Sequence, residues 1–166
     1  AVTSESGPGS TGWEPTSGET TGHPGECDDP FPNDDPFAVP AIPLQQCQES
    51  VMGTFDADFN VDWYRFSFGV DCDYSPFGTT LYASLSEPGR VCLFVDCESQ
   101  DEPFCGDTGE PEFQDGLRGC CVAAPGQVGV VPFGCNVAPD LFVRVEPPFD
   151  GDFACQPYAV DVYAPS

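Results

Sequence analysis

The sequence predicts an all-β fold, an antiparallel jelly-roll-like β-sandwich of about eight strands that is rich in disulfide bonds. Three observations support this fold class. Apolar and polar residues alternate along several short segments, which is the strand period, and no window repeats with the helical period. The 18 glycines and 19 prolines are too many for a helical protein. Hydrophobic residues make up 40% of the 166, enough for one packed domain with a polar outer surface.

Residues 1–26 differ in composition from the rest of the chain. Ser, Thr, Gly and Pro account for most of them, so this segment lacks the apolar surface that would offset the entropy of ordering it. We expect an extended arm or stalk over 1–26 and a disulfide-stapled sandwich over 27–166. The same composition is typical of O-glycosylated stalks. The candidate acceptors are Thr3, Ser4, Ser6, Ser10, Thr11, Thr16, Ser17, Thr20 and Thr21.

The next segment, 27–43, alternates proline with acidic and aromatic residues, and we expect it to lie extended on the surface outside any ladder. Period-2 strands follow. In the first of them Tyr64, Phe66, Phe68 and Val70 share one face. The regular strands are expected at 61–70, 79–86, 91–95, 141–145 and 158–162, and less regular ones at 44–54, 119–123 and 128–133.

Proline and glycine pairs mark the expected turns between these strands, at 75–78, 87–89, 125–126 and 147–151. Residues 98–118 are polar and show no strand pattern, so they predict a long loop. Cys105 lies inside this loop, and a disulfide there would hold down an insertion that has no core of its own.

The cysteines are ten in number, widely spaced, and without the paired C-x2-C units of structural zinc sites. They therefore predict five disulfides formed in an oxidising compartment, although the connectivity stays open. Adjacent Cys120 and Cys121 point to opposite faces of an extended segment, so they should bond to different partners. The full set is Cys27, Cys47, Cys72, Cys92, Cys97, Cys105, Cys120, Cys121, Cys135 and Cys155.

The charge is strongly one-sided, with 28 acidic residues against 4 basic ones and a net charge of −24. Nucleic acids and anionic membranes require a cationic surface, so neither is expected as a partner. No apolar run reaches the roughly 20 residues of a membrane span. With the cysteines and an N-terminal Ala1 in place of Met, this predicts a mature secreted protein, extracellular or at the cell surface.

Two segments of the chain carry a resemblance to a known family: Asp29-Pro-Phe-Pro-Asn33-Asp34-Asp35, and Asn60-Val-Asp62-Trp63-Tyr64-Arg65-Phe66. The first is similar to the opening, and the second resembles the most recognisable strand, of the pre-peptidase C-terminal domains of secreted bacterial proteins. Residues 78–85, 141–146 and 158–162 are similar to later strands. The resemblance implies a non-catalytic, secreted, jelly-roll-like sandwich, some relatives of which bind calcium or polymers.

A candidate calcium site follows from oxygen-bearing side chains at alternate positions. Asp56, Asp58, Asn60 and Asp62 can present several oxygens from one extended stretch, although the spacing is not that of an EF-hand. The resemblance implies that Asn33 and Asp35 complete the site, but the usual Glu of the family's opening is Phe31 here. A solvated acidic turn is the alternative interpretation. No other cofactor is expected.

Catalysis is not expected. The single histidine, His23, lies in the arm, the chain has no lysine, and no Gly-x-Ser-x-Gly elbow occurs. Close carboxylate pairs arise by chance among 28 acids, so they do not by themselves indicate a glycosidase.

Five aromatic residues fall on strand faces opposite the inferred core: Trp63, Tyr82, Phe94, Phe142 and Tyr163. Such rings can stack on sugars or be covered by another subunit. Two functions are therefore expected. The first is a structural subunit of an extracellular fibre or surface assembly, which self-associates into oligomers or filaments. The alternative is a monomeric module that binds an extracellular polymer, either carbohydrate or protein.

Overall fold

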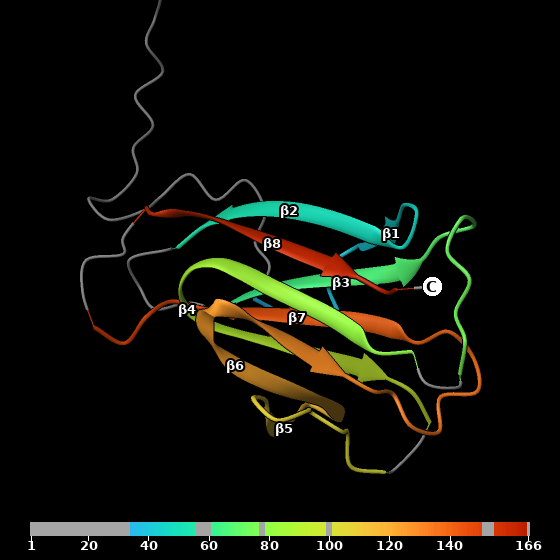
Figure 1. Ribbon diagram of the computed structural model, residues 1–166. Coiled ribbons are helices and arrows are strands. Elements are labelled where there is room, and N and C mark those ends of the chain that lie inside the picture. The colour runs from blue at the N-terminus through green and yellow to red at the C-terminus, as the bar shows by residue number, and fades with distance from the viewer. Residues whose placement is uncertain (1–33, 56–60, 77–78, 99–100, 151–154, 166) are drawn as a thin grey trace, which may run out of the picture.

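The computed structural model in Figure 1 describes residues 34–55, 61–76, 79–98, 101–150 and 155–165. These residues form an all-β fold without a helix, which confirms the predicted fold class. The expected arm over 1–26, with its nine glycosylation candidates, lies outside the described residues. The eight strands are β1 (Ala41–Leu44), β2 (Gln48–Thr54), β3 (Asp62–Phe68), β4 (Leu81–Asp96), β5 (Glu110–Gln114), β6 (Leu117–Val130), β7 (Asp140–Glu146) and β8 (Pro157–Tyr163).

The strands form two layers that share the long strands β4 and β6. The larger layer has the order β1-β3-β7-β4-β6-β5 and uses the second half of β4 and the first half of β6. The smaller layer has the order β2-β8-β4-β6 and uses the other halves of β4 and β6. Figure 1 shows β2 and β8 lying above β3 and β7.

The predicted turns at 87–89 and 125–126 are wrong, because these residues lie inside the long strands β4 and β6. Leu85 pairs with Gly126 and Gly89 pairs with Ala124, so three residues of β4 oppose one residue of β6. This is a bulge within a continuous ladder, and it bends both strands at the same level as they pass from one layer to the other. Gly89 has φ 153°, and a Cβ on it would lie 2.4 Å from the carbonyl oxygen of Glu146. The turn residues therefore mark a bend instead of a strand end.

Two further expectations need correction. Residues 41–43, expected outside any ladder, belong to Ala41–Leu44 (β1), which pairs in parallel with Arg65–Phe68, whereas the other ladders between the described strands are antiparallel. β1 is an edge strand, where the missing N–H of Pro43 is tolerated. The segment 98–118, expected to be a loop, contains β5, which pairs with the start of β6. The sequence of β5 shows no alternation of apolar and polar residues, because it contains Pro111 and three acidic or amide residues, Glu110, Glu112 and Gln114.

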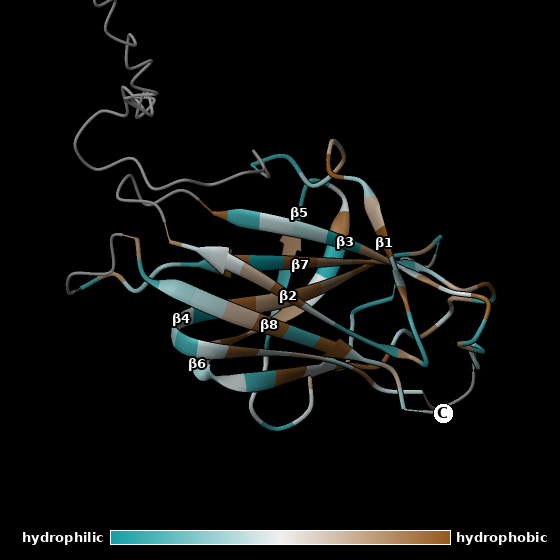
Figure 2. Cartoon of the chain, turned by 90° about the horizontal axis from the view of Figure 1, so that it is seen from above, coloured by the Kyte–Doolittle hydropathy of each residue, from teal (hydrophilic) through white to brown (hydrophobic). Residues whose placement is uncertain are grey.

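The main core lies between the layers and consists of the apolar positions that the strand pattern predicted. Leu81, Ala83 and Leu85 of the smaller layer face Leu141, Val143 and Val145 of the larger layer, and all are buried. Figure 2 shows hydrophilic and hydrophobic residues alternating along the strands, which is this in-and-out pattern seen from above. The expected strand over 61–70 ends early, because Val70 lies beyond β3 and is 99% exposed.

All nine described cysteines are disulfide-bonded, which indicates an oxidising, non-cytoplasmic compartment. Cys120 bonds to Cys105 on the core side and Cys121 bonds to Cys92 on the opposite side, so the prediction of different partners is confirmed. The partner of Cys155 lies outside the described residues. The remaining described bonds are Cys47–Cys72 and Cys97–Cys135. Among the described residues no helix is long and apolar enough to cross a membrane.

Candidate functional site

The outer face of the smaller layer is a polar surface that carries two aromatic rings. We call it the tyrosine face. The register places its residues in two adjacent rows across four strands, because every second residue of each strand points away from the core. At the usual strand spacing each row is about 14 Å long. The first row is Gln48, Tyr163, Tyr82 and Gly129, and the second is Ser50, Asp161, Ser84 and Gln127.

Tyr82 and Tyr163 stand directly opposite each other on β4 and β8 and stack with their ring centroids 4.8 Å apart and their planes 16° from parallel. Gln127 Nε2 donates to the Tyr163 hydroxyl oxygen at 2.5 Å. Tyr82 also lies against Gly129, where an added Cβ would be 3.1 Å from its Cε1 atom. Both rings are partly exposed. The neighbours therefore hold the rings in one orientation while leaving part of each in contact with solvent.

The stacked pair lies between two hollows. The larger, of about 1000 Å³, is lined by Tyr163 and by amide and carboxylate side chains that include Gln46, Asp73 and Asp161. The smaller, of about 280 Å³, is lined by Tyr82, Thr80, Thr108 and Gln127 and by the apolar Phe104 and Val131. Tyrosines at the border of the two hollows can contact a ligand that extends across both.

A strained turn forms one wall of the larger hollow. Gln45 and Gln48 exchange both backbone hydrogen bonds, at 3.1 and 3.0 Å, around the central residues Gln46 and Cys47. Both central residues have positive φ, 50° and 61°, which is the conformation of a type I′ hairpin turn. Asn-Gly is the usual sequence for this turn, whereas Gln-Cys is strained in it. The Cys47–Cys72 disulfide fastens the turn at its second central residue.

The outer face of the larger layer carries the other three predicted contact aromatics, Trp63, Phe94 and Phe142, and we call it the tryptophan face. These three rings lie on the side of the sheet opposite the main core, as predicted. They are at most 1% exposed, however, and form a second buried cluster with Leu117. They are therefore unavailable to a ligand in this structure. Phe37 contacts Phe142 with ring centroids 5.7 Å apart.

Arg144 is the centre of the tryptophan face. Its guanidinium lies 5.7 Å from the Trp63 ring centroid and 5.4 Å from that of Phe94. It also pairs with Glu112, at 2.5 Å, and with Glu146. Burial alone would raise the pKa of Glu112, but hydrogen bonds and charge attraction from Arg144 and Arg90 outweigh burial and hold that pKa below its ordinary value. The network pairs a buried cation with two carboxylates, which is a structural role, although the buried Nε of Arg144 has no hydrogen-bond partner among the described residues.

Cys92, Glu112 and Cys121 bring three potential metal ligands together on the same face. Cys92 and Cys121 are directly opposite each other in the β4–β6 ladder and are joined in a disulfide. Because metals bind the thiolate form, this disulfide removes two of the three ligands.

The candidate calcium ligands are only partly described. Asn33, Asp56, Asp58 and Asn60 lie outside the described residues. The Oδ1 atom of Asp35 accepts a hydrogen bond from the amide of Phe37 at 2.9 Å. Asp62 is buried and accepts a hydrogen bond from the Tyr158 hydroxyl. Calcium binding therefore stays a prediction.

Asp62 belongs to a buried hydrogen-bond network with Tyr158 and Tyr64, whose hydroxyl oxygens are 2.8 Å apart. Burial, together with the neighbouring Tyr64 and Asp62, raises the pKa of Tyr158 well above its ordinary value, so this hydroxyl stays protonated and donates. Gly53 leaves room for the network, since a Cβ there would lie 2.3 Å from the Tyr158 hydroxyl oxygen.

Tyr82 and Tyr163 are predicted contact residues, whereas the polar residues around them are not predicted from the sequence. Ser84 and Asp161 could have been found, because they lie two positions from the tyrosines on the same strand faces. Gln48 and Gln127 required the register of β2 and of the bent strand β6, and no sequence signal gives that register.

No protein-family model matches the chain, and no curated protein matches it either. Among solved structures, the chain is similar to PliG of Salmonella Typhimurium, a periplasmic lysozyme inhibitor of g-type lysozyme. The similarity covers 77% of this chain and 100% of that chain, with a TM-score of 0.41 and 11% sequence identity. A likeness this distant supports no conclusion about function. The resemblance to pre-peptidase C-terminal domains stays a prediction.

Proposed function

We propose that this protein is a secreted, non-catalytic module that binds an extracellular polysaccharide on its tyrosine face. The observation that carries the proposal is the stacked, partly exposed pair Tyr82–Tyr163 between two hollows, the larger of which is mainly polar. Aromatic rings pack against the apolar faces of sugar rings, and tyrosine adds a hydroxyl that can form hydrogen bonds.

The surroundings of the pair suit a ligand that is rich in hydroxyl groups. Gln48 and Gln127 offer amide donors and acceptors, Ser50 and Ser84 offer hydroxyls, and Asp161 offers a carboxylate acceptor. A few fixed polar groups around an apolar contact are the usual means by which binding sites orient a ligand. The −24 charge disfavours acidic polysaccharides, so a neutral one is expected.

A retention assay on insoluble neutral polysaccharides, such as cellulose, chitin and β-glucan, tests the proposal. The wild-type chain should be retained on at least one of them, and Tyr82→Ala and Tyr163→Ala should each lower affinity about tenfold, equivalent to about 1.4 kcal/mol. Phe149→Ala is the matched control, since Phe149 is 88% exposed and lies off the tyrosine face. Retention on none of these polymers, or equal retention of all variants, would contradict the proposal.

A second candidate, a structural subunit of an extracellular assembly, is favoured by the edge strand β2. Among the described strands, β2 pairs only with β8, and its seven residues contain no proline. The edge strands of the larger layer, β1 and β5, contain Pro43 and Pro111, which restrict strand addition. Met52, in the middle of β2, is 77% exposed. A free edge of this kind can accept an extended strand from another copy.

Negative-stain microscopy with and without calcium tests the second candidate. Copies with a charge of −24 repel each other, so filaments should form only when a divalent cation bridges them. Met52→Lys places a charge on the β2 edge and should abolish them. Discrete particles under both conditions would remove this candidate and leave the polysaccharide proposal intact.

A further inference from the structure

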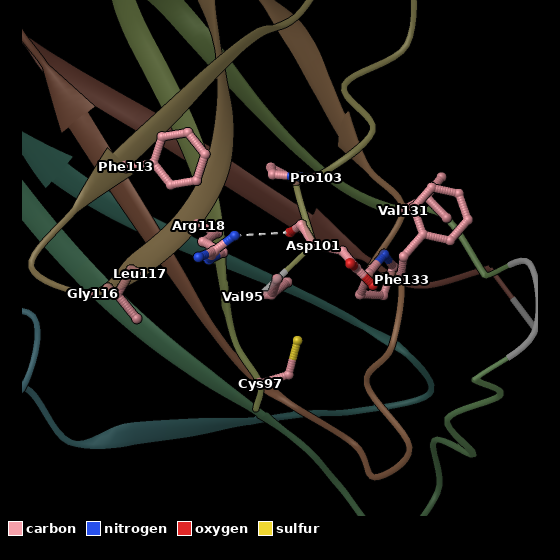
Figure 3. Close-up of a pocket in the computed structure, with 11 residues that line it drawn as sticks. Val95, Cys97, Asp101, Pro103, Phe113, Gly116, Leu117, Arg118, Val131 and Phe133 are labelled. Atoms are coloured by element: carbon pink, nitrogen blue, oxygen red, sulfur yellow. Dashed lines mark hydrogen bonds between the residues drawn. The ribbon is translucent and has the colours of Figure 1, made fainter. Parts of the chain in front are cut away.

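We infer that a second surface, at the β5–β6 end of the molecule, docks a cationic protein partner by taking one of its apolar side chains into a pocket. The surface consists of the pocket drawn in Figure 3 and three exposed phenylalanines, Phe104, Phe113 and Phe133, and we call it the phenylalanine pocket. It adjoins the tyrosine face, because Phe104 and Val131 also line the smaller hollow beside Tyr82. Neither stacked tyrosine lines the phenylalanine pocket, so the inference does not depend on the proposed function.

The three phenylalanines come from three segments that meet at Val131. Phe104 forms a bridge with Val131, and the Phe133 amide donates to the Val131 carbonyl at 3.0 Å. Phe113 of β5 lines the same hollow as Val131 and Phe133, and Figure 3 shows Phe113 and Phe133 on opposite sides of it. Each ring is 53–57% exposed. Large exposed apolar groups that gather in one place are typical of protein interaction sites.

The size and lining of the hollow favour a side chain over a small molecule. Its volume is about 220 Å³, below the roughly 300–1,000 Å³ of typical small-molecule pockets. Val95, Leu117, Val131 and Pro132 provide apolar walls. A single leucine- or phenylalanine-sized anchor is the occupant that such a pocket suits, in the manner of a central interface anchor.

The rim of the pocket is held in place before any partner arrives. Cys97, which lines the hollow, is bonded to Cys135, and Cys105 beside Phe104 is bonded to Cys120 of β6. The Arg118 guanidinium lies 5.2 Å from the Phe113 ring centroid and donates to the Asp101 carbonyl at 3.2 Å. A pre-formed rim lowers the entropic cost of binding.

The charge around the pocket determines which kind of protein can approach it. Asp101 lines the pocket, and further acidic residues lie along the chain segments that supply its lining, at Asp96, Glu98, Glu102, Asp107, Glu110 and Asp115. Arg118 is the only basic residue over the same stretch and the following strand. A second copy of this chain would bring another −24 charge to the surface, so charge complementarity favours a lysine- or arginine-rich partner.

Three synthetic peptides of matched length test the inference: Lys-Lys-Phe-Lys-Lys, Lys-Lys-Ser-Lys-Lys and Glu-Glu-Phe-Glu-Glu, each measured by isothermal titration with the folded protein. The first should bind about tenfold more tightly than the second, because only it carries the anchor, and the third should not bind. The affinity of Lys-Lys-Phe-Lys-Lys for the protein should fall as the salt concentration is raised. Equal binding of the first two peptides would show charge attraction alone and overturn the inference, as would binding of the acidic peptide.

Substitutions locate the site. Phe113→Ser and Phe133→Ser should each lower the affinity for Lys-Lys-Phe-Lys-Lys about tenfold, whereas Phe149→Ser should leave it unchanged. All three replace exposed rings, so the melting temperatures should stay close to that of the wild type, and this is checked first. Unchanged affinity in both pocket variants would also overturn the inference. Retention on polysaccharide should be unaffected by these variants, which keeps the two proposals separable.

Discussion

The tyrosine face and the tryptophan face use the same local arrangement with opposite results. On each face an aromatic ring of β4 lies against a glycine directly opposite it on β6: Tyr82 against Gly129, and Phe94 against Gly119. On the tyrosine face the ring stays partly exposed. On the tryptophan face Phe94 is fully buried beside Trp63.

The difference comes from what lies on each face. The tryptophan face has Phe37 against Phe142, Leu117 in its cluster and Arg144 over two of its rings. The tyrosine face has polar side chains around its rings and a hollow on each side. Alternation along a strand thus decides which face a side chain is on, whereas contacts from distant segments decide whether that face is a core or a surface.

The largest expected effect is the difference in stability between Trp63→Ala and Tyr163→Ala. Removing the buried Trp63 ring should lower the free energy of unfolding by about 3–5 kcal/mol, because it leaves a cavity. Removing the partly exposed Tyr163 ring should cost about 1 kcal/mol, in the range of one aromatic pair. Urea denaturation followed by circular dichroism measures both values. Similar losses for the two variants would mean that the two faces are equally buried.

Arg144→Met and Arg65→Met should also differ in the free energy of unfolding that they lose, by a smaller margin. Arg144 is almost fully buried, so its loss leaves Glu112 and Glu146 with only the more exposed Arg90 as a shared cation and should cost about 3 kcal/mol. Arg65 pairs with Asp140 at a more exposed position, with 34% of its side chain accessible, and should cost about 1 kcal/mol or less. Thermal unfolding at constant pH compares them. If Arg65→Met were the more damaging, the central role given to Arg144 would be wrong.

The two glycines provide a matched pair for a third comparison. A Cβ on Gly119 would lie 2.2 Å from the Leu93 carbonyl oxygen and 2.7 Å from the Phe94 Cα, and backbone cannot move away cheaply. Gly119→Ala should therefore cost about 1–3 kcal/mol. A Cβ on Gly129 meets only the Tyr82 and Thr80 side chains, at 3.1 and 3.3 Å, so Gly129→Ala should cost less than 1 kcal/mol. Unfolding curves that show the reverse order would contradict the packing described for the β4–β6 pair.

The smallest expected effect is a pH dependence that arises from the tryptophan face. The pKa of Glu112 is lower in the folded protein than in the unfolded chain, so its contribution to stability is present above the unfolded pKa of about 4.3 and is lost as pH falls below it. Glu112→Gln should reduce the loss of stability between pH 6 and pH 3. Denaturation midpoints at the two pH values measure this, and an unchanged pH dependence in the variant would exclude Glu112 as a contributor.

The sequence was sufficient for the parts of the fold that depend on local alternation. The core positions Leu81, Val143 and Val160, the opposite directions of Cys120 and Cys121, and the outward face of Tyr82 all follow from the two-residue period. The bulge in β4 was misread as a turn, because Pro88 and Gly89 are turn residues that a bulge also uses.

The rest depended on contacts between segments far apart in the sequence. The parallel pairing of β1 with β3 places a proline-containing segment in a ladder, which no local rule favours. The burial of Trp63, Phe94 and Phe142 depends on β6, β7 and the segment around Phe37. The two tyrosines of the candidate site were therefore predictable from the sequence. The arrangement of four strands that places polar groups around them was not.

Hydroxyl-radical footprinting with mass spectrometry tests most directly whether the two faces differ. In the native protein, Tyr82 and Tyr163 should be oxidised readily, whereas Trp63, Phe94 and Phe142 should be protected until denaturant is added. Trp63 oxidised in the native protein as fast as Tyr82 would contradict this account, since tryptophan is protected only where solvent is excluded.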